Sequence, residues 1–201
     1  MAAEPVVVFS DFTCPFSHVT EAALRRLEDE GLAAPRYAAF ELYPAPAPLP
    51  PAASAEDVEA ARPLAEALGI ALEAPRAVPR TRKAHEAAKA AEAKGAGRAM
   101  REAIFRARFA EGRDVGRIDV LVELGAALKL DPTELKVVLD LDTFAAAVDG
   151  DRALARRLGI EAVPALLVGG GAEARLLVGA QPYAALRALL VEMAPGADAP
   201  G

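Results

Sequence analysis

The sequence predicts an α/β fold in which a βαβ unit near the N-terminus and a ββα unit near the C-terminus share one sheet. Three observations support it. A β-branched run at 6–9 precedes a stretch of helix-forming residues, residues 54–144 are helical in pattern almost throughout, and two short apolar runs flank glycines near residue 170. Because each terminal unit is too small to bury its own apolar faces, both must contribute to one sheet. The long helical block is therefore an insertion into that sheet.

The first unit consists of a strand, a helix and a second strand. The strand covers about Val6–Phe9, and the helix runs from Pro15 to about Glu30, where Gly31 provides a C-terminal stop. A second strand is expected over Arg36–Leu42. Strand, helix and strand at this spacing favour a parallel βαβ unit.

A proline-dense connector at 43–51 follows and cannot be helical. It is either a stiff linker or a loop that also borders the functional site. Beyond it, Ser54 before two acidic residues and Asp131 before Pro132 indicate helix N-termini. Four or five helices are expected, with breaks near residue 69 and at 75–79, 95–97 and 112–116.

Strand signals return at 165–168 and 175–178, on either side of three consecutive glycines, and indicate a hairpin. An amphipathic helix at about 182–193 follows. This order is the outline of a thioredoxin-like fold with a large all-α insertion. The predicted thioredoxin-like domain is discontinuous and comprises residues 1–45 and 150–194; the α-helical insertion domain comprises residues 46–149, and residues 195–201 form a flexible tail.

The composition limits the classes of partner. A net charge of −6 argues against nucleic acid, which requires clustered Lys and Arg. The first residues lack the basic and apolar regions of a signal peptide. No window holds the roughly eighteen continuous apolar residues of a membrane span. We therefore expect a cytoplasmic protein without a membrane partner, and the sequence does not indicate its oligomeric state.

The single cysteine, Cys14, lies between the first strand and the first helix. Pro15 suits the first position of a helix, which makes Cys14 the expected N-cap. At that position the helix dipole favours a thiolate over a thiol. The alternative is that Cys14 is a small buried hydrophobe, as many lone cysteines are. One cysteine also excludes a disulfide within the chain.

Five segments carry a resemblance to a known family. Residues 9–17, with the motif Cys-Pro-Phe-Ser, resemble the active-site segment of DsbA-like thioredoxin-fold proteins, and four others resemble its FrnE-type subgroup, at 40–44, 81–85, 103–114 and 158–164. The resemblance covers about residues 5–192. It implies a catalytic Cys14 beside a cis Val163–Pro164 bond, with the Val163 backbone presented to a peptide or thiol ligand.

The departure from the family lies at Ser17, where the subgroup usually has a second cysteine. A hydroxyl cannot resolve a mixed disulfide, because thiol–disulfide exchange proceeds by thiolate attack on sulfur. Three routes remain open. An external thiol such as glutathione resolves the adduct of Cys14, or Cys14 pairs with Cys14 of a second chain. In the third route glutathione is a bound cofactor, as in the similar 2-hydroxychromene-2-carboxylate isomerases and kappa-class glutathione transferases, which carry a serine in this segment.

The expected function is that of a DsbA-like thiol–disulfide oxidoreductase with one nucleophilic cysteine. No cofactor is required, and glutathione is an allowed ligand. The alternatives are a glutathione-dependent isomerase or transferase and a non-catalytic thiol- or peptide-binding module. The partner is a disulfide or thiol substrate, or a small molecule together with glutathione. The expected catalytic residues are Cys14 and Ser17, and the expected substrate-binding residues are Pro15, Phe16, Val163, Pro164 and His85.

Other polar residues have two interpretations each. Asp11 is interpreted as a turn- or helix-capping carboxylate rather than a proton shuttle, and Glu41 as solvated or salt-bridged. His18 either contacts Cys14 or points around the helix. Arg106, Arg108 and Arg113 form a solvated helix face by default, or hold a carboxylate-bearing ligand, which suits glutathione. With two histidines and one cysteine in the chain, no metal-ligand cluster is expected.

Overall fold

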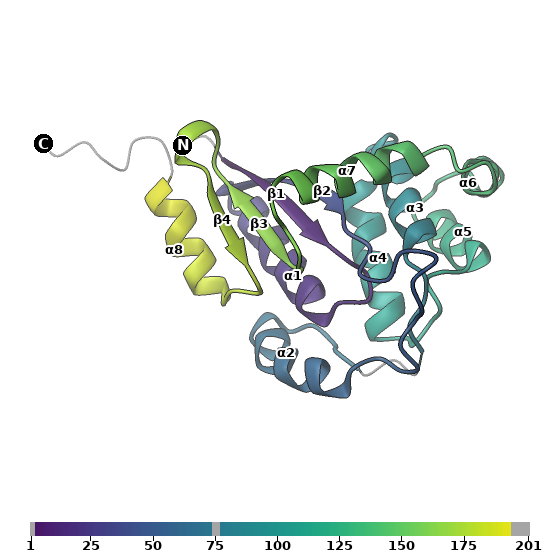
Figure 1. The fold of residues 1–201 in the computed structure, drawn as a ribbon, viewed down its shortest axis with the longest axis horizontal. Helices are drawn as coiled ribbons and strands as arrows, with labels where there is room; N and C mark the ends of the chain where they lie inside the picture. The colour runs from purple at the N-terminus through teal and green to yellow at the C-terminus, as the bar shows by residue number, and fades with distance from the viewer. Residues whose placement is uncertain (1–2, 74–76, 194–201) are drawn as a thin grey trace, which may run out of the picture.

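The computed structural model describes residues 3–73 and 77–193 (Figure 1). In these residues the chain forms four strands, eight α-helices and a short 3-10 turn at Gly171–Glu173. In chain order the elements are β1 Glu4–Ser10, α1 Pro15–Asp29, β2 Ala33–Ala39, α2 Ala55–Leu68, α3 Arg82–Glu92, α4 Gly97–Phe109, α5 Ile118–Ala127, α6 Pro132–Asp140, α7 Ala145–Arg157, β3 Ala165–Val168, β4 Arg175–Val178 and α8 Tyr183–Met193.

The strands form one mixed sheet in the order β2-β1-β3-β4. β1 and β2 are parallel, and the pairs β1–β3 and β3–β4 are antiparallel. This topology confirms the predicted α/β thioredoxin-like fold, in which the two terminal units share one sheet. Since parallel neighbours require a crossover, α1 connects β1 to β2 across one face of the sheet (Figure 1).

The second strand lies earlier than the sequence predicted. Its pairing with β1 runs from Glu4 opposite Ala33 to Ser10 opposite Ala39. Beyond it the Leu42 N–H donates to the Asp11 carboxylate rather than to a neighbouring strand. The prediction of a strand over 36–42 was therefore wrong by about three residues. The Asp11 side chain accepts the hydrogen bond that the Leu42 N–H would have donated to a neighbouring strand.

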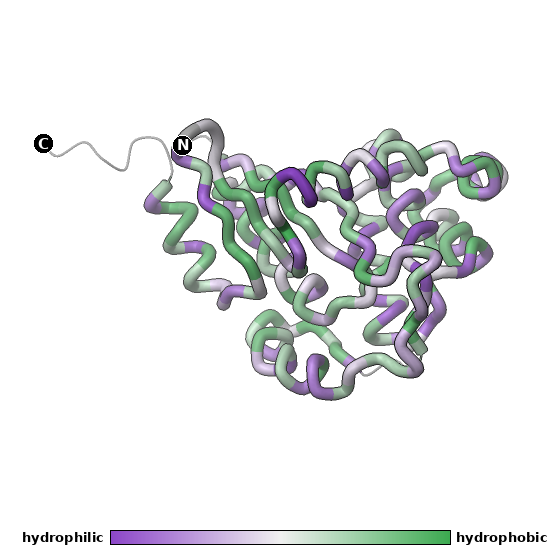
Figure 2. The backbone as a smooth tube through the Cα atoms, viewed as in Figure 1, coloured by the Kyte–Doolittle hydropathy of each residue, from purple (hydrophilic) through white to green (hydrophobic). Residues whose placement is uncertain are grey.

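Helices cover both faces of the sheet. α1 and α8 pack against the side chains of Val6, Val8, Leu166 and Val168 and form one core cluster with them. α7 covers part of the opposite face, where Ala155 packs with residues of β1, β2 and β3. Figure 2 shows hydrophobic residues along the central strands and alternating hydrophobic and hydrophilic residues along the helices. This alternation is expected where one side of a helix is buried.

The helical block packs directly onto the end of the sheet that carries Cys14. Phe12, before α1, and Val19, in α1, belong to the same buried cluster as residues of α2 to α6. The Arg101 guanidinium of α4 donates to the Glu21 carboxylate of α1 and to the Ser10 hydroxyl of β1, at 2.5–2.8 Å. Buried charge is tolerated when it is paired and hydrogen-bonded, so this network fastens the block to the sheet.

Within residues 54–144 the described chain forms five helices, α2 to α6, as expected, and a sixth helix follows before β3. The additional helix, α7, runs across residues 149 and 150, where the sequence analysis placed a domain boundary. The division into two domains stays a prediction, and its flexible tail, residues 195–201, lies outside the described residues. Among the described helices, none is long and apolar enough to span a bilayer.

Candidate functional site

Cys14 is the N-cap of α1, as predicted. Its backbone is extended, with φ −91° and ψ 116°, and Pro15 occupies the first turn of the helix. The Ser17 N–H donates to the Cys14 sulfur at 3.3 Å. The sulfur thus satisfies one of the backbone donors that every helix leaves free at its start.

The loop before β3 lies directly opposite the sulfur. The Val163–Pro164 peptide bond is cis, which confirms the expectation from the resemblance. The Cys14 thiol donates to the Val163 carbonyl oxygen, with 3.5 Å between sulfur and oxygen. The Pro164 carbonyl accepts from the Gly179 N–H at 2.8 Å and ties this loop to the end of β4. The fold therefore brings together two backbone segments that are 149 residues apart.

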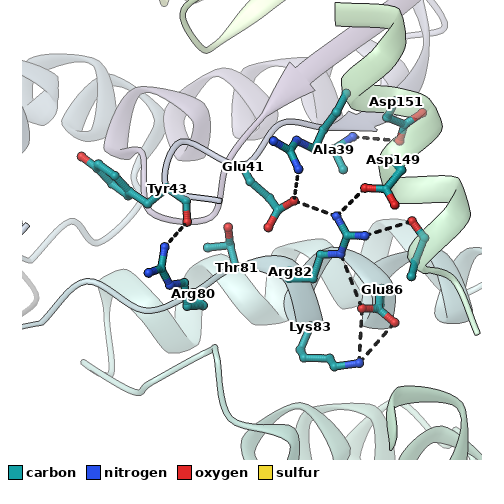
Figure 3. A network of polar contacts seen from close by, with 12 residues as sticks. Ala39, Glu41, Tyr43, Arg80, Thr81, Arg82, Lys83, Glu86, Asp149 and Asp151 are labelled. Carbon is teal, nitrogen blue, oxygen red and sulfur yellow. Dashed lines mark hydrogen bonds and ion pairs between the residues drawn. The ribbon is translucent and has the colours of Figure 1, made fainter. Parts of the chain in front are cut away.

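Cys14 lines a cavity of about 400 Å³ that separates the sheet end from α2. Tyr43 and Pro50 of the proline-dense connector contribute to its wall, so the connector is a loop that borders the site. Arg80 holds this connector. Its guanidinium donates to the Tyr43 carbonyl oxygen at 2.7 Å (Figure 3), and to the Ala47 carbonyl oxygen at 2.6 Å. The lining residues are Thr13, Cys14, Pro15, Phe16, Leu42, Tyr43, Pro50, Ala52, Ala53, Ser54, Asp57, Val58, Val78, Phe109 and Val163.

Burial has the largest effect on the pKa of the Cys14 thiol. Cys14 is only 6% exposed, and the loss of solvent raises its pKa to about 11. Hydrogen bonds from the Ser17 side chain and backbone lower the pKa, whereas the nearby Asp11 charge raises it. The expectation of a favoured thiolate was therefore wrong. A helix N-terminus stabilises an anion, but here the surrounding side chains exclude the water that a thiolate requires.

Asp11 organises the turn beneath the cysteine. One carboxylate oxygen accepts from the Thr13 N–H at 2.7 Å and from the Thr13 hydroxyl at 2.9 Å. The other accepts from the Leu42 N–H at 2.6 Å and from the Thr81 hydroxyl at 3.1 Å. The interpretation of Asp11 as a capping carboxylate is confirmed, although it joins three segments rather than one. Burial raises the pKa of this carboxyl in spite of these bonds.

Ser17 lies behind the sulfur rather than in the cavity. It is fully buried, and its hydroxyl accepts from the Asp11 N–H at 3.3 Å. His18 points away from Cys14 and stacks on Phe105 and Phe109, with centroid distances of 5.1 and 5.5 Å. Burial lowers the pKa of His18 to about 4, so the ring is neutral at neutral pH. Of the two interpretations of His18, the structure favours the one without a contact to the thiol.

His85 is not part of the Cys14 cavity. It is buried against Phe12, with 4.8 Å between ring centroids, and it lines a separate cavity of about 220 Å³ together with Tyr37, Lys89 and Arg101. Neither ring nitrogen has a partner among the described residues. The structure therefore does not place His85 where we expected a substrate-binding residue. The reason is that Phe12 fills the space between α3 and the cysteine turn.

The remaining charged candidates form ion pairs or lie elsewhere. Glu41 contacts Arg82 at 3.0 Å and Arg152 at 3.3 Å, which confirms a salt-bridged role (Figure 3). Arg106 is exposed and pairs with Glu111 at 3.2 Å, whereas Arg108 is buried and does not belong to a solvated face. Within the part of the chain that the structure describes, no group of His, Cys, Asp and Glu is arranged to hold a metal ion.

Several residues that line the cavity were missed by sequence reasoning. Tyr43, Asp57, Val58 and Phe109 contribute to its wall from the connector, α2 and α4. Phe109 lies in a segment that carried the family resemblance, which was the only available signal. Val58 reads as an ordinary buried helix residue, and only the tertiary packing of α2 brings it to the site.

These features define a thioredoxin-fold thiol protein, in which an N-cap cysteine faces a cis-proline loop. A family model for the DSBA-like thioredoxin domain matches residues 5–191, and the chain belongs to this family. The FrnE-type subgroup stays a prediction. The chain is 29% identical to the uncharacterized protein YwbO of Bacillus subtilis over 146 residues, which are 69% of this chain and 73% of YwbO.

Solved structures share the fold over most of the chain. A probable DsbA oxidoreductase from Streptomyces coelicolor is 25% identical, with a TM-score of 0.82 over 98% of this chain and 92% of that protein. The cytosolic disulfide reductase DsbM from Pseudomonas aeruginosa is 23% identical, with a TM-score of 0.72 over 92% of this chain and 98% of DsbM. A 2-hydroxychromene-2-carboxylate isomerase is 19% identical, with a TM-score of 0.73 over 94% of each chain. The last two likenesses concern the fold alone.

Proposed function

We propose that this protein is a thiol–disulfide oxidoreductase that works through the single nucleophile Cys14, with an external thiol such as glutathione to release the adduct. One observation carries the proposal. Cys14 is the single cysteine of the chain, and its sulfur lies at a helix N-terminus, lines a cavity and faces a cis-proline loop. Phe16, Pro15 and the Val163 backbone border the place where a ligand sulfur would lie.

The proposed reaction has two exchange steps. In the first, the Cys14 thiolate attacks one sulfur of a substrate disulfide; the Cys14–substrate disulfide forms, the original S–S bond breaks, and the second sulfur leaves as a thiolate that takes up a proton. In the second, a thiolate from the external thiol attacks the substrate sulfur of this adduct. A disulfide between the external thiol and the substrate forms, and Cys14 leaves and is reprotonated. The substrate disulfide is reduced at one sulfur, and the external thiol is oxidised.

The raised pKa of Cys14 favours the reductive direction. A strong dithiol oxidant owes its potential to a stabilised thiolate in the reduced state. Burial withholds that stabilisation here and makes Cys14 a poor leaving group. The adduct at Cys14 is therefore expected to be long-lived, and the reduced protein is expected to act as a sulfur acceptor. The similar protein DsbM is a cytosolic disulfide reductase that has also been solved with glutathione, which supports this direction and a cytoplasmic location.

The glutathione-dependent isomerase remains the second function to test, because Ser17 occupies the place of a resolving cysteine. Against it, Ser17 is fully buried and does not line the cavity, so it has no route to a glutathione sulfur. In an isomerase, glutathione binds without a covalent bond and still binds the Cys14→Ala variant. In a binding module, an extended peptide protects Cys14 from alkylation without turnover.

Steady-state kinetics with a glutathionylated peptide test the proposal. We expect release of the free peptide thiol by the wild type, with the parallel double-reciprocal lines of a ping-pong mechanism as glutathione is varied. The Cys14→Ser variant should release no peptide above the uncatalysed rate, and the Ser10→Ala variant controls for general disturbance of β1. Calorimetric binding of glutathione to Cys14→Ala, together with no peptide release by the wild type, would replace this proposal with the isomerase.

A further inference from the structure

Arg108 is a buried cation that has no hydrogen-bonded carboxylate among the described residues. It belongs to α4 and is 2% exposed, and its Nε and Nη2 atoms have no hydrogen-bond partner among the described residues. The Phe109 ring lies beside it, with 5.8 Å between the ring centroid and the guanidinium carbon. The charges of Asp114 and Asp11 favour the charged form of Arg108, but neither carboxylate accepts a hydrogen bond from Nε or Nη2. By contrast, Arg101 on the same helix is equally buried but is bound by Glu21 and Ser10. An unpaired buried charge is costly, and a ligand that compensates it would explain its presence.

The Arg108 side chain lines a cavity of about 500 Å³ that adjoins the Cys14 cavity. Val78 belongs to the walls of both cavities, and Phe109, next to Arg108, lines the Cys14 cavity. Burial lowers the pKa of Arg108 to about 10, which still leaves the guanidinium charged at neutral pH. The residues around this second cavity are Glu73, Ala77, Val78, Pro79, Arg108, Ala110, Glu111, Gly112, Arg113 and Asp114.

The charges in this wall restrict the ligand. Arg113 is already paired with Glu123 at 2.6 Å, so Arg108 is the cation that remains available among the described lining residues. Glu111 is paired with Arg106 at 3.2 Å, but Glu73 and Asp114 line the same cavity and would repel a multiply charged anion such as a phosphate ester. A ligand with one carboxylate and a nearby ammonium group complements the charges of this wall. Its carboxylate would pair with the Arg108 guanidinium, and its ammonium would lie near the acidic side chains.

We propose that Arg108 binds the carboxylate of a small thiol built from amino acids, and so holds that thiol for its reaction at Cys14. The inference rests on the proposed function, because it names the chemical class of the external thiol. Arg108 is in this account a binding residue for the thiol and takes no part in the exchange of sulfur bonds.

The test uses the mixed disulfide of Cys14 with 2-mercaptoethanol, a neutral group that has no carboxylate. Attack of a thiolate on the mercaptoethanol sulfur forms a disulfide between the two small thiols and releases Cys14, as in the proposed release step; the freed protein is followed by intact-mass measurement. The attacking thiols are glutathione and its diethyl ester, which lacks both carboxylates. For the wild type we expect glutathione to react about 10- to 100-fold faster than the ester, the range of a charge-assisted hydrogen bond.

The variants assign this preference to one side chain. Arg108→Met should lose the preference and react with both thiols at the slow rate, while Arg108→Lys should keep part of it. Arg98→Gln is the matched control on the same helix, because Arg98 is exposed, pairs with Asp29 and lines neither of these two cavities; it should react as the wild type does. The melting temperature of Arg108→Met should equal or exceed that of the wild type, since an uncompensated buried charge is removed.

Three results would overturn the inference. They are equal rates for the two thiols in the wild type, a preference that persists in Arg108→Met, and a preference that is lost equally in Arg98→Gln. If Arg108→Met fails to fold, the comparison of glutathione with its diethyl ester in the wild type still tests the inference. Failure of the proposed function has a different signature, because no thiol would then release Cys14 from its adduct in the native protein faster than in the urea-unfolded chain.

Discussion

The reactivity of Cys14 should depend steeply on pH. With a pKa of about 11, the thiolate fraction at pH 7 is about 10⁻⁴, compared with about 3% for an unperturbed thiol of pKa about 8.5. We therefore expect the rate of alkylation by iodoacetamide to rise about tenfold per pH unit from pH 7 to pH 10, without a plateau. The assay is intact-mass measurement of the modified fraction over time, with the urea-unfolded protein as control, whose rate should level off above pH 9.

Stability gives an independent measure of the same pKa. Because the folded-state pKa lies above the unfolded one, the native thiol holds its proton where the unfolded chain loses it. The stabilisation is complete below about pH 8.5 and is lost as pH rises toward 11, by at most about 3 kcal/mol. The difference in unfolding free energy between wild type and Cys14→Ser isolates this contribution from that of other groups. A native alkylation midpoint at or below 8.5, with no such pH-dependent difference, would refute the reasoning from burial.

Three further predictions concern single side chains. Ser17→Cys places a second sulfur one helical turn from Cys14, where a disulfide is geometrically accessible; we expect loss of both free thiols on oxidation and reduction of insulin without glutathione. Glu21→Gln leaves the Arg101 charge without its carboxylate and should lower the unfolding free energy by about 3–5 kcal/mol in urea titrations, with a smaller loss in the double variant Glu21→Gln/Arg101→Met. Buried neutral His18 should destabilise the wild type as pH falls from 6.5 toward 4, because the unfolded chain takes up a proton that the native ring refuses; His18→Phe should reduce that slope.

Local features of this chain were predictable because they depend on neighbouring residues. Ser54 and Asp131 cap their helices as expected, through bonds to backbone N–H groups three residues on. Cys14 as N-cap and Pro15 in the first turn followed from the same logic. The cis bond before Pro164 followed from the family resemblance and not from any local pattern, since proline opens strands in either isomer.

What failed depends on contacts between distant segments. The end of β2 is set by the Asp11 carboxylate, which accepts the Leu42 N–H. The place of His85 is set by Phe12, which fills the space toward the cysteine. The pKa of Cys14 is raised by burial under the connector and α2. The sequence indicated only the helix N-terminus, which acts in the opposite direction and lowers the pKa. None of these contacts leaves a periodic or spacing signal in the chain.

The central claim is that Cys14 accepts a sulfur from a disulfide and returns it to an external thiol. Intact-mass analysis of the native protein with glutathione disulfide, followed by an excess of glutathione, tests it most directly. We predict that the wild type gains one glutathionyl group on Cys14, that glutathione removes it, and that Cys14→Ser gains none. A native protein that stays unmodified, under conditions where its urea-unfolded form is fully modified, would contradict the claim and make Cys14 an inert buried thiol.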